Sequence, residues 1–599
     1  MGDCVRHRGP DASGTWAEDD IGFAHRRLAV VGLGDEGAQP MHSPSGRFVL
    51  TYNGEIYNHQ ELRRSLGRMG PSSGWRGQSD TETLAVAVEV WGLEAALERV
   101  VGMFAFALWD RANRTLTLVR DRIGEKPLYW MHHHQSLFFA SQPRSLWSGI
   151  GMTPGIDPDA LDDLLRYARV PGARTMHRGV LEVEPGTLLR FTSGSRAPEK
   201  RHWWSGVSVA MEGTRDPLAG SEAFVAETVE TALQAAVTAQ AVADVPVGAF
   251  LSGGIDSSLI VALLAQSTNT TVRTFTVGFS EHEADESRFA REVAERLGTE
   301  HTEVLLSASE ALAMVPRLPE IYDEPIADIS QVPTALISTV TRSQVTVALS
   351  GDGGDELFGG YPRYWKAKVL ADQARRRRWN PRHWGSIVRR RSGLSTLRGG
   401  RHIDWEIVHG FASARRLPQG LVLEAGTSEG ESCLRRVWES TASLGDLSER
   451  FMAFDLLSYL PEVLLHKVDR AAMAVSLETR MPMLDPRVIE LAWRLPVEAR
   501  IRGRVGKRVL RRILEKRLPH VSFDRPKAGF VIPVDNWLRG PLRGWAEDLL
   551  DPELIGEQGL LDHTKVAALW ADHRERRADL GRTLWPILMF QSWHAANPH

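Results

Sequence analysis

A serine- and glycine-rich turn near the middle of the chain has the residue types that bind phosphate. The apolar run 245–251 predicts a buried strand and 259–265 predicts a helix, with Ser252-Gly253-Gly254 between them. Glycines let the backbone come close to a ligand, and a helix start points unpaired N–H groups at an anion. The turn also carries three hydroxyl donors: Ser252, Ser257 and Ser258. Asp256 would repel a bare phosphate, so its presence predicts a divalent cation between the carboxylate and the phosphates. An ordinary glycine-rich turn is the alternative, but the whole pattern favours a nucleotide site.

A second apolar strand pattern also ends in a loop of glycines and acids. The segment 347–361 is Val-Ala-Leu-Ser-Gly-Asp-Gly-Gly-Asp-Glu-Leu-Phe-Gly-Gly-Tyr. Three carboxylates fall in one turn: Asp352, Asp355 and Glu356. Such crowding is unfavourable unless a cation or a helix N-terminus offsets it.

These two loops and a third segment, 465–485, together resemble the synthetase domain of glutamine-dependent asparagine synthetase, an ATP pyrophosphatase that adenylates its substrate. The resemblance runs from about Ala241 to Phe530, with the motifs in the family's order. It implies that Asp256 and Asp355 ligate Mg²⁺ and that Asp352 and Lys467 are catalytic. Asp352 would lie near the intermediate, and Lys467 would stabilise the pentacovalent phosphorus. The implied ATP-binding residues are Leu251, Ser252, Gly253, Gly254, Asp256, Ser257, Ser258, Val277, Ser350 and Gly351.

Several residues of these segments also have plain structural interpretations. Lys467 could be a solvated helix residue, although its apolar neighbours favour function. Lys507 fits a phosphate contact and a solvated basic helix equally well. The loop 322–328 fits a substrate-positioning or ammonia-channel role as well as a turn capped by Asp323. Arg480 and Asp485 are left as structural residues at a helix end.

Five segments of the first 130 residues resemble the glutaminase domain of the same family. They are 7–11, 25–31, 52–58, 77–80 and 120–129. The resemblance implies that Arg27 pairs with the carboxylate of glutamine through its planar fork. Asp80 and Glu55 would take the α-ammonium, and Asn53 and Gly54 would form an oxyanion hole. Taken singly, each segment fits a β-turn with surface ion pairs.

The family's nucleophile has no counterpart in this chain as given. In the family, a cysteine exposed by removal of the initiator methionine attacks glutamine, with its own α-amino group as base. Here residue 2 is Gly2, and Cys4 lies only three residues before the His7-Arg-Gly-Pro motif. Met1 is therefore expected to belong to the helix before that motif. Two explanations stay open: a gene start assigned too far downstream, which the retained pocket residues favour, or a chain that uses free ammonia. Residues 1–599 are expected to use ammonia.

Composition indicates a globular chain of at least two domains. The 599 residues are 43% hydrophobic and 25% charged, with a net charge of −3. A slightly acidic chain is not expected to bind nucleic acid, and no apolar run is long enough to span a bilayer. Two cysteines and a polar N-terminus predict a reduced, cytoplasmic compartment. The arginines at 375–378 and 389–391 are interpreted as a surface insertion, and His132–His134 as a hairpin tip rather than a metal site.

The periodicity of the chain predicts α/β and α+β structure in two domains. Residues 1–150 show short alternating strands and are assigned to an incomplete Ntn-hydrolase-type α-β-β-α sandwich, which the resemblance implies. Residues 151–220 are interpreted as a connector. Residues 221–599 begin with alternating helices and strands, which predict a doubly wound parallel sheet with helices on both faces and a helical C-terminal part.

The leading hypothesis is a carbon–nitrogen ligase that adenylates L-aspartate with ATP and Mg²⁺ and then forms the amide. Its partners would be ATP, a carboxylic acid, and glutamine or ammonia, with a homodimer as the assembly to test. An alternative is amidation of another carboxylate in natural-product biosynthesis. A third, from a different class, is a non-catalytic protein that binds nucleotide or glutamine.

Overall fold

The chain is described by a computed structural model that covers most of its length. The described residues are 1–71, 74–193, 195, 197–279, 287–306, 308–377, 400–412, 417–426, 429–524 and 532–597. Most of the predicted basic insertion, at 378–399, lies outside these residues. Two regions share the fold, one built on antiparallel strands and one on a parallel sheet.

The N-terminal region contains three sheets whose paired strands are antiparallel. The largest has the order β11-β10-β6-β5-β4-β3, with β3 (Met41–His42), β4 (Phe48–Ile56), β5 (Gly102–Asp110), β6 (Thr115–Arg120), β10 (Thr187–Thr192) and β11 (Glu199–His202). The second has the order β8-β7-β9, with β7 (Tyr129–His133), β8 (Ser136–Ala140) and β9 (Val180–Glu182). The third is the hairpin of β1 (Ala12–Glu18) and β2 (Ile21–Arg27).

Strand β5 shows why these sheets stack. Its side chains alternate, so Phe104 and Phe106 pack on one face while Ala105 and Ala107 pack on the other. The phenylalanine face is covered by α1 (His59–Leu66), α2 (Asp80–Trp91) and α3 (Leu93–Arg99). The alanine face meets the β8-β7-β9 sheet, whose outer side is covered by α4 (Pro143–Ile150). The predicted α-β-β-α sandwich is confirmed.

Part of the predicted connector belongs to the N-terminal sheets. Strands β9, β10 and β11 lie within 151–220, and β10 pairs directly with β6. The N-terminal region therefore continues to His202, and the helix α6 (Gly206–Arg215) follows it. The domain boundaries at 150 and 220 remain proposals.

The C-terminal region is organised by a five-stranded sheet in the order β14-β13-β12-β15-β16. All neighbours are parallel: β12 (Val247–Phe250), β13 (Arg273–Phe279), β14 (Glu300–Leu306), β15 (Val347–Leu349) and β16 (Glu478–Arg480). In β15, Val347 and Leu349 pack on one face and Ala348 on the other. Both faces are thus buried, as a parallel sheet requires.

Helices cover both faces of this sheet. One face packs against α7 (Glu222–Gln240), α8 (Ile255–Ser267), α9 (Ser287–Leu297) and α21 (Arg508–Arg517). The other meets α12 (Gln331–Arg342) and α18 (His466–Met473). The doubly wound sheet predicted from 221 onward is confirmed.

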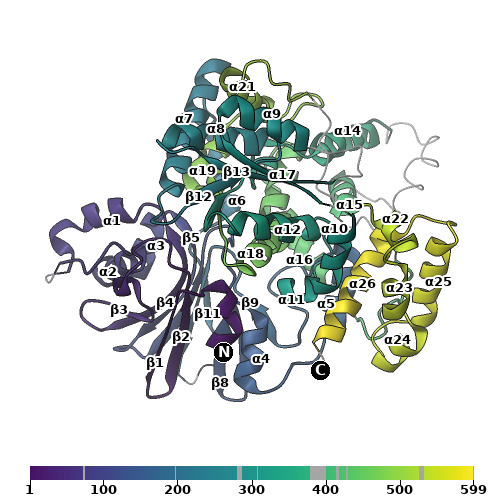
Figure 1. Cartoon of the computed structure of the whole chain (residues 1–599), viewed down its shortest axis with the longest axis horizontal. Coiled ribbons are helices and arrows are strands. Elements are labelled where there is room, and N and C mark those ends of the chain that lie inside the picture. The colour runs from purple at the N-terminus through teal and green to yellow at the C-terminus, as the bar shows by residue number, and fades with distance from the viewer. Residues whose placement is uncertain are drawn as a thin grey trace.

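Beyond the sheet the described chain is mostly helical, as expected. The remaining helices are α5 (Pro158–Tyr167), α10 (Ala308–Met314), α11 (Leu318–Tyr322), α13 (Gly354–Phe358), α14 (Pro362–Arg377), α15 (Gly400–Ala412), α16 (Glu429–Ser440), α17 (Leu447–Leu457), α19 (Pro486–Arg494), α20 (Val497–Arg500), α22 (Val534–Arg539), α23 (Arg543–Leu549), α24 (Pro552–Gln558), α25 (His563–Arg574) and α26 (Gly581–Ala596). Helices α22 to α26 gather at the end of the molecule away from α1 to α3 (Figure 1). Of the helices described, none is long and apolar enough to cross a membrane.

The histidine run at 132–134 lies at the end of the β7–β8 hairpin, as predicted. Within the described ranges, no group of three or more His, Cys, Asp or Glu side chains is placed to hold a metal ion.

Candidate functional site

The two predicted phosphate-site loops leave neighbouring strands at one edge of the parallel sheet. Strands β12 and β15 are parallel, with Ala249 opposite Leu349, so Leu251 and Ser350 begin their loops side by side. The chain runs from β12 outward to β13 and β14, then returns to β15 on the opposite side of β12. Open α/β sheets bind ligands at such a switch point, outside the carboxyl ends of the strands.

The turn after β12 has the geometry of an anion cradle. Gly253 has φ +69°, and a Cβ there would lie 2.6 Å from the Ala290 nitrogen, so only glycine fits. The Ser257 hydroxyl accepts a hydrogen bond from the Ser252 backbone N–H (3.2 Å) and lies 3.0 Å from the Ser252 hydroxyl. Helix α8 begins at Ile255, so its first N–H groups open onto this turn. Ser258 is fully buried within the helix packing.

The carboxylates of Asp256 and Asp355 converge on one ammonium group. The Lys507 Nζ lies 2.6 Å from Asp355 Oδ1 and also donates to Asp256 Oδ2. A Cβ at Gly354 would lie 2.6 Å from Asp256 Cγ, so this glycine allows the two loops to touch. Burial lowers the pKa of the Lys507 ammonium, but the two carboxylates outweigh burial and hold it above its ordinary value. Lys507 is only 7% exposed, so its interpretation as a solvated helix residue is wrong.

The residues at this edge fit a magnesium ion. Two carboxylates approach each other from separate loops, and Mg²⁺ prefers oxygen ligands with room left for phosphate oxygens and water. The hydroxyls of Ser252 and Ser257 lie in the same turn as Asp256. These donors are of the types that a magnesium ion and phosphate oxygens would need.

The remaining predicted nucleotide residues lie along the same edge. The Ser350 hydroxyl donates to Asp352 Oδ2 (2.7 Å), and the Ser350 N–H donates to the Arg480 carbonyl (2.8 Å). Leu251 is buried, and its N–H donates to the Phe275 carbonyl in β13 (2.9 Å). Val277, two residues further along β13, is also buried.

Lys467 pairs with a different acidic loop. From the start of α18, its ammonium lies 3.1 Å from Asp328 Oδ2 and donates to the Ser330 hydroxyl (2.6 Å). Burial alone would raise the pKa of Asp328, but Lys467 and Ser330 bring it below its ordinary value. Lys467 is buried, so the solvated interpretation is also wrong here. The loop 322–328 therefore supplies the anion that holds this lysine.

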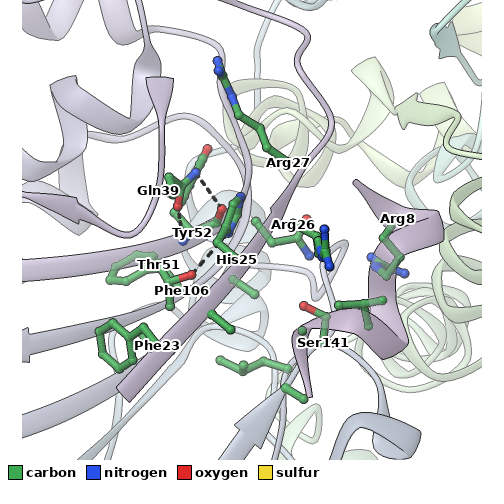
Figure 2. Close-up of a pocket in the computed structure, with 18 of the residues that line it drawn as sticks. Arg8, Phe23, His25, Arg26, Arg27, Gln39, Thr51, Tyr52, Phe106 and Ser141 are labelled. Carbon is green, nitrogen blue, oxygen red and sulfur yellow. Dashed lines mark hydrogen bonds between the residues drawn. The ribbon is translucent and has the colours of Figure 1, made fainter. Parts of the chain in front are cut away.

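The five predicted glutamine-binding residues line one cavity of about 540 Å³ in the N-terminal region. They are Arg27, Asn53, Gly54, Glu55 and Asp80. Figure 2 shows part of this cavity, with His25 and Thr51 hydrogen-bonded and Gln39 bonded to Tyr52. Two residues of the C-terminal region, Met473 and Glu478, also reach its wall.

The polar groups of this cavity are arranged to receive a ligand. The Asn53 amide nitrogen is buried and has no hydrogen-bond partner among the residues described, as an oxyanion donor would require. Asp80 accepts hydrogen bonds from the Tyr52 hydroxyl (2.8 Å) and the Ile56 N–H (3.0 Å). Burial nevertheless raises the pKa of Asp80. Burial and the Asp80 carboxylate raise the pKa of Glu55 well above its ordinary value.

Arg27 lines the cavity, and its guanidinium is engaged by backbone carbonyls of the following loop. Its guanidinium donates to the carbonyls of Gly32 and Gly34, the latter at 2.8 Å. In Figure 2 its side chain points away from His25 and Tyr52. Within the part of the chain that is described, the cavity wall contains no cysteine.

Buried ion pairs join the two regions beside both sites. Arg8, in the 3₁₀ helix η1 (Gly2–Arg8), forms two hydrogen bonds with Asp469, at 2.7 and 2.9 Å. The Arg480 guanidinium lies 3.4 Å from Glu55, while its backbone carbonyl accepts from Ser350. One residue of β16, Arg480, therefore contacts both the cavity around Arg27, Asn53, Gly54, Glu55 and Asp80, called here the glutamine-type cavity, and the sheet edge that carries Ser252–Ser258 and Ser350–Glu356, called here the nucleotide edge.

The structure thus joins an α-β-β-α sandwich that contains a polar cavity to a doubly wound α/β sheet with a glycine- and serine-rich turn at its carboxyl edge. The Asparagine synthase family matches residues 228–595, and the Glutamine amidotransferase domain matches residues 1–204. A Putative asparagine synthetase [glutamine-hydrolyzing] of Mycobacterium bovis is 34% identical, over 99% of this chain and 92% of that protein. Asparagine synthetase [glutamine-hydrolyzing] 1 of Bacillus subtilis is 29% identical, over 100% and 93%. Amidase chry2 of Gibberella zeae is 25% identical, over 94% and 88%.

The chain belongs to the asparagine synthase family. It is a carbon–nitrogen ligase of the class that takes its amide nitrogen from glutamine.

Several groups at these sites escaped sequence reasoning. Asp328 and Ser330 hold Lys467, and Arg8 holds Asp469 across 461 positions of sequence. Lys507 was visible only as one of two equal interpretations. The glycine before Lys507 could have indicated its position. Gly506 packs against the Gly359 carbonyl, which brings the lysine close to the Asp355 loop.

Proposed function

We propose that the chain adenylates a carboxylate with ATP at the switch-point edge and then converts the acyl-adenylate to an amide. The observation that carries this proposal is the convergence of Asp256 and Asp355 from two loops at one end of the parallel sheet. L-Aspartate is the proposed acid, and the amide product is then asparagine.

In the first step, the substrate carboxylate attacks the α-phosphorus of ATP and pyrophosphate leaves. The backbone N–H groups and hydroxyls of the turn 252–257 hold the leaving pyrophosphate. Asp256 and Asp355 would hold a magnesium ion, which would supply positive charge to offset the negative charge of the leaving pyrophosphate. Leu251 and Val277 supply apolar surface for the adenosine, with Ser350 and Gly351 beside them.

Asp352 and Lys467 are the proposed catalytic side chains. Asp352 is held by the Ser350 hydroxyl, which fixes a carboxylate next to the expected intermediate. Lys467 carries the positive charge that would stabilise the pentacovalent phosphorus. Its pairing with Asp328 and Ser330 fixes the ammonium in place before the reaction begins.

Ammonia then attacks the acyl carbon and AMP leaves. Glutamine is the nitrogen source of the family, and the cavity around Asn53, Glu55 and Asp80 is the proposed glutamine pocket. Residues 1–599 as given are proposed to use free ammonia, because no cysteine of the described chain lines that pocket. Glutamine-driven turnover by this purified chain would contradict the missing-nucleophile proposal.

The decisive experiment is ATP–pyrophosphate exchange scored over a panel of carboxylic acids. Exchange that depends on aspartate supports asparagine synthesis. Exchange with a different acid only would replace aspartate and retain the adenylation chemistry. A protein that exchanges with no acid, although it binds nucleotide, would be a non-catalytic binder.

A second candidate is amidation of another carboxylate in natural-product biosynthesis. The relatives named Amidase chry2 and Amidase chyE favour it, since both match 94% of the chain. The same panel distinguishes the two candidates when it includes acids larger than aspartate.

A further inference from the structure

We propose that Lys507 is a tethered cation that makes metal binding at Asp256 and Asp355 depend on phosphate. In this role Lys507 is a positioning residue for the two carboxylates. The inference rests on the proposed function for the identity of the site, and it adds an order to the binding of metal and nucleotide.

The ammonium of Lys507 lies between the two carboxylates and contacts one oxygen of each. Lys507 contacts Asp355 Oδ1 at 2.6 Å and donates to Asp256 Oδ2, so each metal-ligating group already shares an oxygen with a positive charge. A divalent cation bound to the same two carboxylates would lie within a few ångströms of the ammonium and repel it strongly in this buried place. The ammonium and the metal therefore compete for Asp256 and Asp355.

The backbone shows that Lys507 is held at this position. Its φ of +54° and ψ of +33° place a non-glycine residue in the left-handed region, which costs free energy and persists only where the surroundings enforce it. The Lys507 N–H donates to the Phe358 carbonyl (3.0 Å), which ties it to the end of α13. A Cβ on Gly360 would lie 2.2 Å from Lys507 Cε, so the side chain passes directly over the Asp355 loop.

Bound phosphate would end the competition between the Lys507 ammonium and the metal ion for Asp256 and Asp355. The Asp256 end of the cradle lies in the first turn of α8, beside the hydroxyls of Ser252 and Ser257. When polyphosphate binds there, its oxygens offer the ammonium a new anionic partner within the reach of its flexible four-carbon stem. The carboxylates are then released to the metal. Metal alone should bind weakly, and metal with polyphosphate should bind well.

The test is a Mn²⁺ titration followed by electron paramagnetic resonance, first with no nucleotide and then with inorganic pyrophosphate. In Lys507→Gln we expect Mn²⁺ alone to bind about tenfold more tightly than in the unmodified chain, because the competing charge is gone. In the presence of Mn²⁺, pyrophosphate should bind about tenfold less tightly, because it has lost a cation. These opposite signs are the signature of a shared lysine, and unchanged or weaker Mn²⁺ binding in Lys507→Gln overturns the proposal.

Two further variants make the titration specific. Lys516→Gln removes an exposed lysine from the same helix α21 and should change neither affinity. Lys507→Arg keeps the charge, so its Mn²⁺ affinity should not rise; a rise would overturn the proposal even if Lys507→Gln failed to fold. The Mn²⁺ titration needs no acid and no turnover. A failed carboxylate panel with the expected Mn²⁺ result would therefore refute the proposed function alone, and the reverse result would refute the role of Lys507 alone.

Discussion

The nucleotide edge and the glutamine-type cavity differ in how the charges of their buried carboxylates are compensated. At the nucleotide edge, Asp256 and Asp355 share the ammonium of Lys507. In the cavity, Glu55 and Asp80 lie near each other, and burial raises the pKa of both. The cation that faces Glu55 is Arg480, 3.4 Å away and contributed by the other region.

This difference indicates that the nucleotide edge depends on the C-terminal region alone, whereas the cavity depends on both regions. The three charged groups of the nucleotide edge, Asp256, Asp355 and Lys507, all belong to the C-terminal region, so their pairing should persist when the N-terminal region is perturbed. The cavity takes part of its wall and its nearest cation from the C-terminal region. Its carboxylates suit an ammonium ligand, which would supply the positive charge that they lack locally.

The largest expected effect is a loss of ATP–pyrophosphate exchange that occurs in variants of the nucleotide edge and not in a variant of the cavity. Asp256→Asn and Lys467→Ala should each lower ATP–pyrophosphate exchange by about a thousandfold or more, because each removes a charge that is proposed to act at the phosphates. Asp80→Asn, in the cavity, should leave ammonium-supported turnover unchanged. The control is Asp159→Asn, which changes an acid in the first turn of α5 instead of α8. Near-normal exchange in Asp256→Asn or Lys467→Ala would show that the site is wrongly assigned.

The next effect concerns the ion pair that joins the regions. Arg8→Gln breaks a buried, doubly hydrogen-bonded pair and leaves Asp469 with less compensation, although Arg470 remains 2.9 Å away. We expect a loss of about 3–5 kcal/mol in stability to chemical denaturation. Arg26→Gln removes an exposed pair with Asp3 and should cost less than about 1 kcal/mol. Equal costs for the two variants would mean that the regions are not held together by the buried pair.

The third effect is a pH dependence at the boundary between the regions. Burial raises the pKa of Glu324 to about 7, although the Met176 N–H donates to it and opposes the shift. A carboxyl group with a raised folded pKa binds its proton more tightly when folded, so stability falls as the pH rises from its ordinary value of 4.5 to about 7.

Glu324→Gln keeps the acceptor for Met176 and removes the titration. The variant should match the unmodified chain near pH 4.5 and exceed it above pH 7 by a free energy on the order of 3 kcal/mol. Thermal unfolding midpoints measured from pH 4.5 to 8 provide the check. A constant difference between the two proteins over this range would show that Glu324 does not titrate as expected.

Local patterns in the sequence were sufficient to predict the nucleotide edge. The strand expected at 245–251 is β12, and the alternating strands and helices expected from 221 onward include β13 and β14, because short apolar runs indicate buried parallel strands. Once those strands are parallel, their carboxyl ends meet at one edge, and Asp256 and Asp355 follow. The sequence alone was therefore sufficient to predict that the loops of Asp256 and Asp355 lie at the same edge of the sheet.

Partners distant in sequence were not accessible in the same way. Nothing near Lys467 indicates that Asp328 would face it, and nothing near Arg8 indicates Asp469, since both pairs depend on how helices and regions pack. The connector prediction missed β9 and β11 and did not show that β10 joins the N-terminal sheet. These short strands pair through registers such as Leu181 with Trp130 and Leu188 with Val119, which connect distant parts of the sequence. The direction of the Arg27 side chain is set by the carbonyls of Gly32 and Gly34, which carry no side-chain signal.

The smallest expected effect is a modest loss of stability when Asp485, a residue of the motif 465–485, is changed. Asp485 was left as a helix-end residue, and it is the N-cap of α19, where its carboxylate accepts a hydrogen bond from the Arg487 N–H at 3.0 Å. Asp485→Ala should cost about 1 kcal/mol of stability, whereas Asp485→Ser should keep most of the cap. Exchange of pyrophosphate should stay near normal in both, because the cap orients a helix and touches no proposed ligand group. If Asp485→Ala lost exchange while its unfolding midpoint matched that of Asp485→Ser, the nucleotide edge would depend on a carboxylate outside its own loops. This result would refute the contrast with the cavity, in which the charges of the nucleotide edge are compensated among Asp256, Asp355 and Lys507 alone.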